Sequence, residues 1–202
     1  MTSIQYVTLE VTDTTAAEKF YADAFGLTDR IHVTRGDSPS SGFRGYTLSA
    51  VVPQPSTARS FFDSAVAAGA TVLKPLASSL WGFGGLVQAP DGAIWNIATS
   101  SKKETGAPER QIDNVVLLIG AEDVGASKKF YVERGLTVNK SFGSYVDFDL
   151  GSSPVGLGLY KRRALAKSAD VAPEGSGSHR IEVASDAGAF TDPDGFSWVA
   201  AS

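Results

Sequence analysis

The amino-acid sequence predicts an α+β fold built from two pseudo-repeated units, because two kinds of segment occur twice. The segment "YVTLEVTDTTAAEKFYADAFGL" at 6–27 has the order strand, helix and glycine stop, and the same order returns in "NVVLLIGAEDVGASKKFYVERGL" at 114–136. Each unit also contains a Pro-Asp-Gly turn followed by a tryptophan, in "APDGAIWNI" at 89–97 and "TDPDGFSWV" at 191–199. A duplication of this kind predicts two similar units in one chain.

The first unit opens on a strand and a helix. Apolar and polar residues alternate between 7 and 11, which is the period of a strand with one buried face. "TAAE" at 15–18 has the spacing of a capping box, and apolar residues then recur at helical spacing until Gly26. A further helix is predicted over 56–69, capped by Ser56 and ended by a glycine.

The two units differ in what lies between their matched segments. The second unit has 42 residues at 137–178, enough for three strands, where the first has only 17 at 28–44. The helix at 56–69 is matched in the second unit by the short segment "DAGAF" alone. The first unit therefore lacks a hairpin and the second lacks a helix. We expect the units to pack as one body in which each covers sheet that the other leaves bare.

The polar stretch "TSSKKETGAPER" at 99–110 contains Gly and Pro and few apolar residues, which is typical of a linker. We expect a first unit over 1–98, the linker over 99–110 and a second unit over 111–202. Because a repeat within one chain can replace a dimer, a monomer and a homodimer are both expected states.

Composition excludes several classes of partner. The chain has 18 Lys and Arg against 22 Asp and Glu, and its largest basic cluster is "KRR" at 161–163, so no nucleic acid is expected as a partner. It has no cysteine, which excludes disulfides and favours a reducing compartment. No apolar run is long enough to cross a bilayer. We therefore expect a cytoplasmic protein with no membrane partner.

The order of these motifs, given twice, resembles the vicinal oxygen chelate superfamily, which includes glyoxalases, bleomycin-resistance proteins and extradiol dioxygenases. The resemblance rests on the segment 6–27, "AGATVLKP" at 68–75, "WGFGG" at 81–85 and the Pro-Asp-Gly turn, and it spans nearly the whole chain. It implies the glyoxalase/bleomycin-resistance fold, in which paired βαβββ modules form curled mixed sheets around a cup. One fold hosts many functions, so the activity does not follow from the fold.

In metal-using members of that superfamily, a His begins the first strand and a Glu stands four residues after the Gly of the turn. The resemblance places Tyr6 and Asn114 at the His positions and Asn96 and Val199 at the Glu positions. A phenol, two amides and an alkyl group are poor ligands for zinc or iron, which prefer imidazole and carboxylate donors. We therefore expect no metal and no other cofactor.

The chain has two histidines, and neither is expected to bind a metal. "SHRIEVAS" at 178–185 resembles the strand that carries another ligand in the superfamily. Strand parity, however, places His179 on the opposite face from Arg180 and Glu182, which predicts a surface or hydrogen-bonded structural histidine. His32, on an apparent edge strand, is expected to be structural as well.

A cup without a metal, lined by polar and apolar groups, suits a planar or amphipathic organic ligand. The predicted ligand-binding residues face the cup or supply flat aromatic or charged groups: Tyr6, Glu10, Arg44, Trp81, Phe83, Asn114, Phe142, Tyr145, Arg180 and Glu182. Trp81 lies in a Gly-rich loop and is the strongest of these candidates, whereas Trp95 and Trp198 are expected in the core. Glu10 would have a raised pKa in a closed cup and act as a general base, and would be an ordinary solvated acid in an open one.

Three functions compete. The leading hypothesis is metal-free binding or sequestration of a small molecule, with no catalytic residue. The alternative is a metal-dependent lyase, isomerase or dioxygenase, similar to lactoylglutathione lyase, with an atypical ligand set. The third is a protein-interaction module that uses the loop at 81–85. The sequence contains no phosphate-cradling glycine loop and no Ser-His-acid arrangement that would add another enzyme class.

Overall fold

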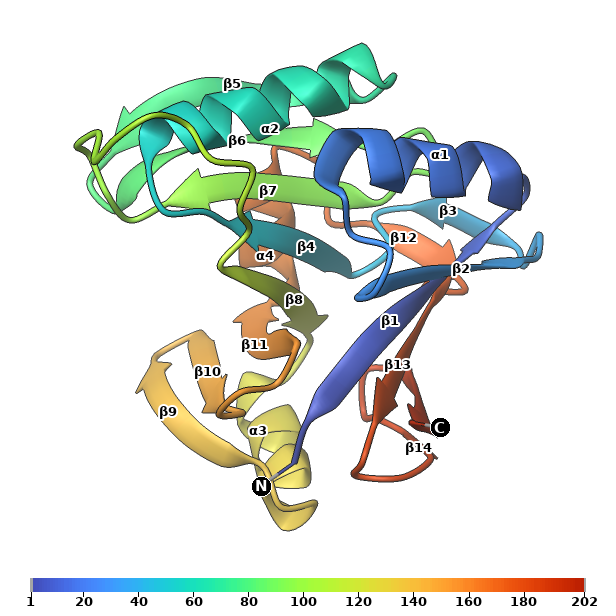
Figure 1. Ribbon diagram of the computed structural model, residues 1–202. Coiled ribbons are helices and arrows are strands. Elements are labelled where there is room, and N and C mark those ends of the chain that lie inside the picture. Colours follow the sequence, from blue (N-terminus) through green and yellow to red (C-terminus); the bar gives the residue numbers. More distant parts are fainter. Residues whose placement is uncertain (1, 202) are drawn as a thin grey trace.

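The computed structural model describes residues 2–201 and contains two complete βαβββ modules (Figure 1). The first consists of β4 (Tyr46–Val51), α2 (Pro55–Ala67), β5 (Thr71–Ser79), β6 (Gly82–Gln88) and β7 (Ile94–Thr99). The second consists of β8 (Asn114–Ala121), α3 (Val124–Glu133), β9 (Thr137–Phe142), β10 (Tyr145–Asp149) and β11 (Val155–Lys161). The fold is therefore α+β with paired modules, as the sequence predicts.

The complete modules are joined through their first strands. Within each module the strands lie in the order first, fourth, third, second, which gives β4-β7-β6-β5 and β8-β11-β10-β9. β4 and β8 are antiparallel, with Leu48 opposite Leu117, so the two modules share one continuous sheet. Figure 1 shows α2 and α3 at opposite ends of the molecule, each on the outer side of its own module.

The two ends of the chain form incomplete modules that complement each other. The N-terminal part supplies β1 (Ile4–Val11), α1 (Thr14–Phe25) and β2 (Ile31–Arg35), and the C-terminal part supplies β13 (Ile181–Ser185), β14 (Phe190–Thr191) and β15 (Ser197–Ala200). β1 pairs antiparallel with β13 and parallel with β2, so strands from the two units are hydrogen-bonded to one another. The predicted losses are confirmed within residues 2–201. The first unit passes from α1 directly to β2, which is parallel to β1 as β11 is to β8, so it lacks the hairpin of β9 and β10, and the second unit has no helix between β13 and β14.

Three short elements complete the fold. β3 (Ser40–Gly42) pairs with β12 (Gly175–Gly177) in a separate ribbon. α4 (Arg162–Ala169) follows β11 directly and was not predicted. None of the helices in residues 2–201 combines the length and the apolar character that a membrane span requires.

The helix starts differ from the predicted ones. Asp13, not the "TAAE" segment, caps α1: its carboxylate accepts a hydrogen bond from the amide of Ala16 at 3.0 Å. Aspartate is as strong a cap as serine, and here it stands immediately before the first turn. α2 begins at Pro55, so Ser56 lies inside the first turn and is not its cap. The predicted stop at Gly26 is confirmed by its left-handed conformation.

One core joins both units. It lies between the outer face of the sheet and the helices α1, α2 and α3. Trp95 and Trp198 are both buried in it, as the sequence predicts, and Trp95 stacks on Phe25 with ring centroids 4.6 Å apart. The segment 100–113 between β7 and β8 contains no helix or strand, and Gln54 anchors it through hydrogen bonds to the amide of Thr105 and the carbonyl of Ala107.

Candidate functional site

The repeated Pro-Asp-Gly turn is tied to the helix of its own unit by a tyrosine. Tyr21 donates a hydrogen bond to Asp91 at 2.7 Å, and Tyr131, at the matching place in the second "KFY" sequence, donates to Asp192. Burial raises the pKa of both phenols, and the neighbouring carboxylate raises it further, so both tyrosines remain protonated donors. The repeated motif thus fixes the turns.

Arg44 and His179 hold the same two turns from the other side. They occupy matched positions, since each precedes the strand that pairs with the tryptophan strand of its unit. Arg44 donates to the carbonyl of Asp91 at 2.7 Å, and His179 Nε2 lies 3.0 Å from the carbonyl of Asp194. The other ring nitrogen of His179 lies 2.5 Å from the Arg44 carbonyl, and its ring stacks on Phe196. His179 is therefore the hydrogen-bonded structural histidine that the sequence predicts.

The residues predicted to line one cup lie on two separate sheet regions. Tyr6, Glu10 and Glu182 are on the polar face of β1 and β13, where Glu182 lies opposite Thr8 in the strand register. Tyr6 stacks on His32 with ring centroids 4.1 Å apart. The aromatic candidates and Asn114 lie instead on the complete modules. The predicted residues are thus spread over two parts of one sheet, since β1 pairs along its length with β13 and meets β11 of the second complete module at Ile4 opposite Val155.

Glu10 does not have the raised pKa that a general base at this position would need. Its carboxylate accepts hydrogen bonds from the amide of Ser38 at 2.6 Å and from the hydroxyl of Ser38 at 2.8 Å. These bonds lower the pKa of Glu10, with a further contribution from the nearby positive charge of Arg180. Glu10 is an ionised residue that anchors the loop between β2 and β3.

The complete modules carry the cup that the fold implies. Residues facing the core alternate along each strand with residues facing inward, and the inward set includes Thr47, Ser49, Asn96, Ala98, Val116, Leu118, Tyr145 and Tyr160. Tyr145 and Tyr160 are opposite each other in the register of β10 and β11, with ring centroids 5.8 Å apart. The sequence placed Tyr145 in the cup but missed Tyr160.

Asn114 does not match Tyr6, as the sequence comparison assumed. Asp13 and Asp123 are the N-caps of α1 and α3, and Tyr6 stands seven residues before the first of them. The residue seven before Asp123 is Val116. Because strand and helix follow without a gap in both units, Val116 is the counterpart of Tyr6, and the second position where the resemblance predicts a His carries an alkyl group.

Helix α4 fills the centre of this cup. Its buried residues Leu165, Ala166 and Ala169 pack against Phe43 and Ile94. Partly buried side chains from the strands surround this cluster: Leu73, Leu86, Leu118 and Tyr160. Lys74 ties the end of the helix to β5 by donating to the carbonyl of Ser168 at 2.7 Å. Figure 1 shows α4 between the two complete modules.

Pockets lie on the concave surface beside the strands that α4 covers. One has a volume of about 300 Å³ and lies along β5, β6 and β7, with Trp81, Leu86, Asn96 and Ala98 among its lining residues. Another has a volume of about 200 Å³ and lies along β8, β10 and β11, with Asn114, Asn139 and Asp147 among its lining residues. Asn96 and Asn114 thus lie in different pockets.

The remaining aromatic candidates occupy hairpin tips. Trp81, at the tip of β5 and β6, has 84% of its surface exposed, and Phe142, at the tip of β9 and β10, has 71% exposed. Phe83 is opposite Thr99 on the core-facing side of β6, and the guanidinium of Arg59 lies 4.7 Å above its ring. The ring of Phe83 therefore packs toward Arg59 of α2, and Phe83 is also one of the residues that line the pocket along β5, β6 and β7.

The residues at the positions where the resemblance to the vicinal oxygen chelate superfamily predicts metal ligands do not suit a divalent metal. They are Tyr6, Val116, Asn96 and Val199, which offer one phenol, one amide and two alkyl groups. Zinc and iron sites are built from imidazole, thiolate and carboxylate donors. Within residues 2–201, no three His, Cys, Asp or Glu side chains come together as such a site requires.

Comparison with known proteins gives the fold. No protein-family model and no curated protein sequence matches the chain. Glyoxalase I from Zea mays has a TM-score of 0.64 and 12% identity, with 98% of this chain and 91% of that chain covered. A putative dioxygenase from Bacillus subtilis has a TM-score of 0.57 and 13% identity, with 90% of this chain and 69% of that chain covered. Identities this low show a shared fold and leave the activity open.

Proposed function

Because the chain has the fold of the vicinal oxygen chelate superfamily, we propose that it is a metal-free binding protein for a small planar or amphipathic molecule. The observation that carries the proposal is the set of residues that line and fill the cup formed by the two complete modules. Its ligand positions hold amide and alkyl groups, α4 fills its centre, and a pocket of about 300 Å³ remains beside an exposed tryptophan. Small-molecule sites combine an apolar lining with a few polar groups, and this pocket has both.

The pocket offers a floor, a polar anchor and a stacking surface. Leu86 and Ala98 form apolar floor on β6 and β7. The amide of Asn96 has one weak partner, the hydroxyl of Ser49 at 3.5 Å, so it retains capacity for hydrogen bonds with a ligand. The indole of Trp81 stands exposed at the rim, where stacking on a flat ligand contributes about 1 kcal/mol beyond burial. The loop at 81–85 thus supplies the stacking surface of the proposed site through Trp81.

Metal-dependent lyase, isomerase or dioxygenase activity is the alternative, and the donor set of this cup argues against it. Metal analysis of protein purified without a tag separates the two. Stoichiometric zinc, nickel, iron or manganese that survives dialysis would contradict the binding proposal, since a bound ion would then have ligands other than the residues at the family positions.

Fluorescence tests the binding proposal directly, because Trp81 is exposed and the other two tryptophans are buried. We expect a planar aromatic ligand from a screening set to quench the exposed emission saturably and to raise the melting temperature. Ala98→Leu places a larger side chain on the pocket floor without entering the core. It should weaken binding about tenfold or more, because the added atoms occupy space that the edge of an aromatic ligand would need.

Matched variants make the test specific. Trp81→Phe should remove the exposed emission and weaken binding, while Phe142→Leu, a change at the equivalent hairpin tip of the other module, should leave affinity unchanged. Both positions are exposed, so neither change should alter stability by more than about 0.5 kcal/mol. If Ala98→Leu binds the same ligand as tightly as the parent, the pocket along β5, β6 and β7 is not the binding site.

A further inference from the structure

The Pro-Asp-Gly turn of the second unit rests on the start of helix α3 through one carboxylate. Asp194 accepts hydrogen bonds from the amide of Glu122 at 2.9 Å and from the hydroxyl of Ser127 at 2.6 Å. It is free to do so because a second aspartate, Asp192, accepts the hydrogen bond of Tyr131. In this unit one carboxylate therefore binds the start of α3 and another binds the tyrosine.

The first unit has only one carboxylate in its turn, so it cannot bind both the tyrosine and the start of the helix. Ala89 stands where the second unit has Asp192, and Asp91, the counterpart of Asp194, turns instead to Tyr21 and to the amide of Ala93. The amide of Thr12, matched to that of Glu122, donates to no side chain of residues 2–201. The place that the Asp194 carboxylate occupies in the second unit is therefore vacated in the first.

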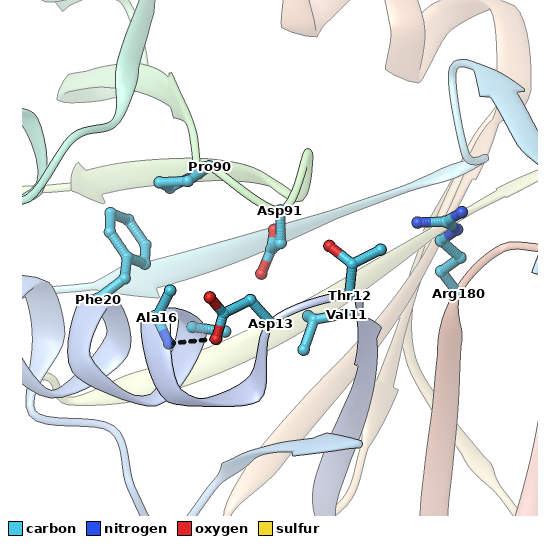
Figure 2. Close-up of a pocket in the computed structure, with 9 residues that line it drawn as sticks. Val11, Thr12, Asp13, Ala16, Phe20, Pro90, Asp91 and Arg180 are labelled. Atoms are coloured by element: carbon cyan, nitrogen blue, oxygen red, sulfur yellow. Dashed lines mark hydrogen bonds between the residues drawn. The ribbon is translucent and has the colours of Figure 1, made fainter. Parts of the chain in front are cut away.

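A cavity of about 310 Å³ lies at this vacated place (Figure 2). Residues of its lining come from the end of β1, the first turns of α1, the Pro-Asp-Gly turn and the approach to β13: Thr12, Asp13, Phe20, Pro90, Asp91 and Arg180. Figure 2 shows the guanidinium of Arg180 on the opposite side of the cavity from Phe20 and Pro90. One wall is therefore apolar and the other cationic.

Arg180 adopts a left-handed backbone conformation, and the residue matched to it in the first unit is a glycine. Its φ is 53°, and the matched residue, Gly45, has φ 82°. A non-glycine residue is strained in this left-handed region, so the side chain is retained there against a local preference. The Nε atom donates to the carbonyl of Ser38 at 2.8 Å, while the two terminal nitrogens form no hydrogen bond or ion pair within residues 2–201. Those nitrogens are available to a ligand.

We propose that this cavity is a second ligand site and that it binds a small monocarboxylate with an apolar tail. The carboxylate takes the place that the Asp194 carboxylate holds in the second unit, accepting from the amide of Thr12 and from the guanidinium of Arg180. The tail lies against Phe20 and Pro90. The site is separate from the pocket along β5, β6 and β7 and does not depend on the function proposed for that pocket.

The acidic neighbours of the cavity do not oppose this assignment. In the second unit, the Asp194 carboxylate is held in the same surroundings, with Asp123 capping α3 and Asp192 two residues away in the turn. In the first unit, Asp13 caps α1 as Asp123 caps α3, and Asp91 accepts the tyrosine hydrogen bond as Asp192 does. Both carboxylates therefore already accept hydrogen bonds from the protein. In the first unit a guanidinium is supplied by Arg180, whereas in the second unit the residue matched to it is Gly45 and the guanidinium of Arg162 fills the space beside that glycine. Glu10 also faces Arg180, but no ion pair forms between them within residues 2–201.

Nuclear magnetic resonance of the full chain tests the site with sodium butyrate as the probe. We expect a saturable shift of the Thr12 amide resonance, no such shift with butyramide, and binding of inorganic phosphate weaker by about tenfold or more because it has no tail. Arg180→Gly should abolish the shift while leaving the melting temperature unchanged or higher, because glycine relieves the strained backbone. Arg163→Gln, at an exposed position outside the cavity, should bind butyrate as the parent does.

A second variant rebuilds the arrangement of the second unit. In Ala89→Asp combined with Ala17→Ser, the new carboxylate should take the hydrogen bond of Tyr21, and Asp91 should then occupy the cavity and exclude butyrate. Three results would overturn the proposal: no saturable Thr12 shift with butyrate, an Arg180→Gly variant that binds as well as the parent, or equal binding of phosphate and butyrate. Loss of fold in the double variant leaves Arg180→Gly as the deciding measurement.

Discussion

Replacement of Trp95 by alanine is expected to lower the free energy of unfolding by about 3–5 kcal/mol, the usual range for removal of a fully buried aromatic side chain. Trp95 has no exposed surface, stacks on Phe25 and contacts Tyr21, so its removal leaves a cavity between β7 and α1. Urea denaturation followed by circular dichroism gives the change as a lower midpoint at unchanged slope.

The three tryptophans supply their own control. Trp81→Ala removes the same side chain from a position with 84% exposure and should change stability by no more than about 0.5 kcal/mol. Trp198→Ala should resemble Trp95→Ala, since Trp198 is buried against Tyr131 and Phe190 in the matched place. A loss of stability for Trp81→Ala equal to that for Trp95→Ala would contradict the assignment of one tryptophan to a pocket rim and two to the core.

The local elements could be predicted from the sequence because their signals are local. Alternation marked β1, the apolar period marked α1, and the length of 137–178 required the three strands that the structure shows. Helix α4 could not be predicted in this way. It has only 8 residues and no side-chain cap, and an isolated helix of that length is marginal, so its stability comes from the cup that it fills.

The site was harder to predict because it depends on which strands pair. Strand parity correctly places Tyr6 and Glu10 on one face, but nothing in a two-residue period indicates that β1 pairs with β13. The residues of the expected cup were therefore divided between two surfaces. Arg44 is predicted from the sequence as a ligand-binding residue, and its hydrogen bond to the carbonyl of Asp91 could not be predicted because the two residues are 47 positions apart.

Comparison of the two units is more informative than either unit alone. Ala89 stands opposite Asp192, and Gly45 stands opposite Arg180, and each difference changes what the neighbouring groups do. The first difference redirects Asp91 and vacates a carboxylate position. The second places a guanidinium beside that position. Two independent changes converge on one cavity, which is why the cavity is assigned a ligand.

Asp192→Ala should destabilise the fold by about 3–5 kcal/mol, because it leaves several buried donors without an acceptor at about 1–3 kcal/mol each. Asp192 has only 5% of its surface exposed and accepts hydrogen bonds from Tyr131 and from the amides of Asp194 and Phe196. Asp192→Asn keeps an oxygen for the two amides and should lose about 1 kcal/mol or less. Thermal and urea unfolding of both variants measure the difference.

The pH dependence of stability distinguishes this carboxylate from an ordinary hydrogen-bonding group. Burial raises the pKa of Asp192 above its ordinary value, although the hydrogen bonds of Tyr131 and Phe196 oppose the shift. Between the ordinary pKa and the raised one, the folded chain therefore binds more protons than the unfolded chain. Stability from this residue is fully present below the ordinary pKa and is lost as the pH rises through the raised pKa. The parent should gain stability relative to Asp192→Asn as the pH falls through that window. A stability difference that stays constant or changes in the opposite direction would show that burial does not raise the pKa of Asp192.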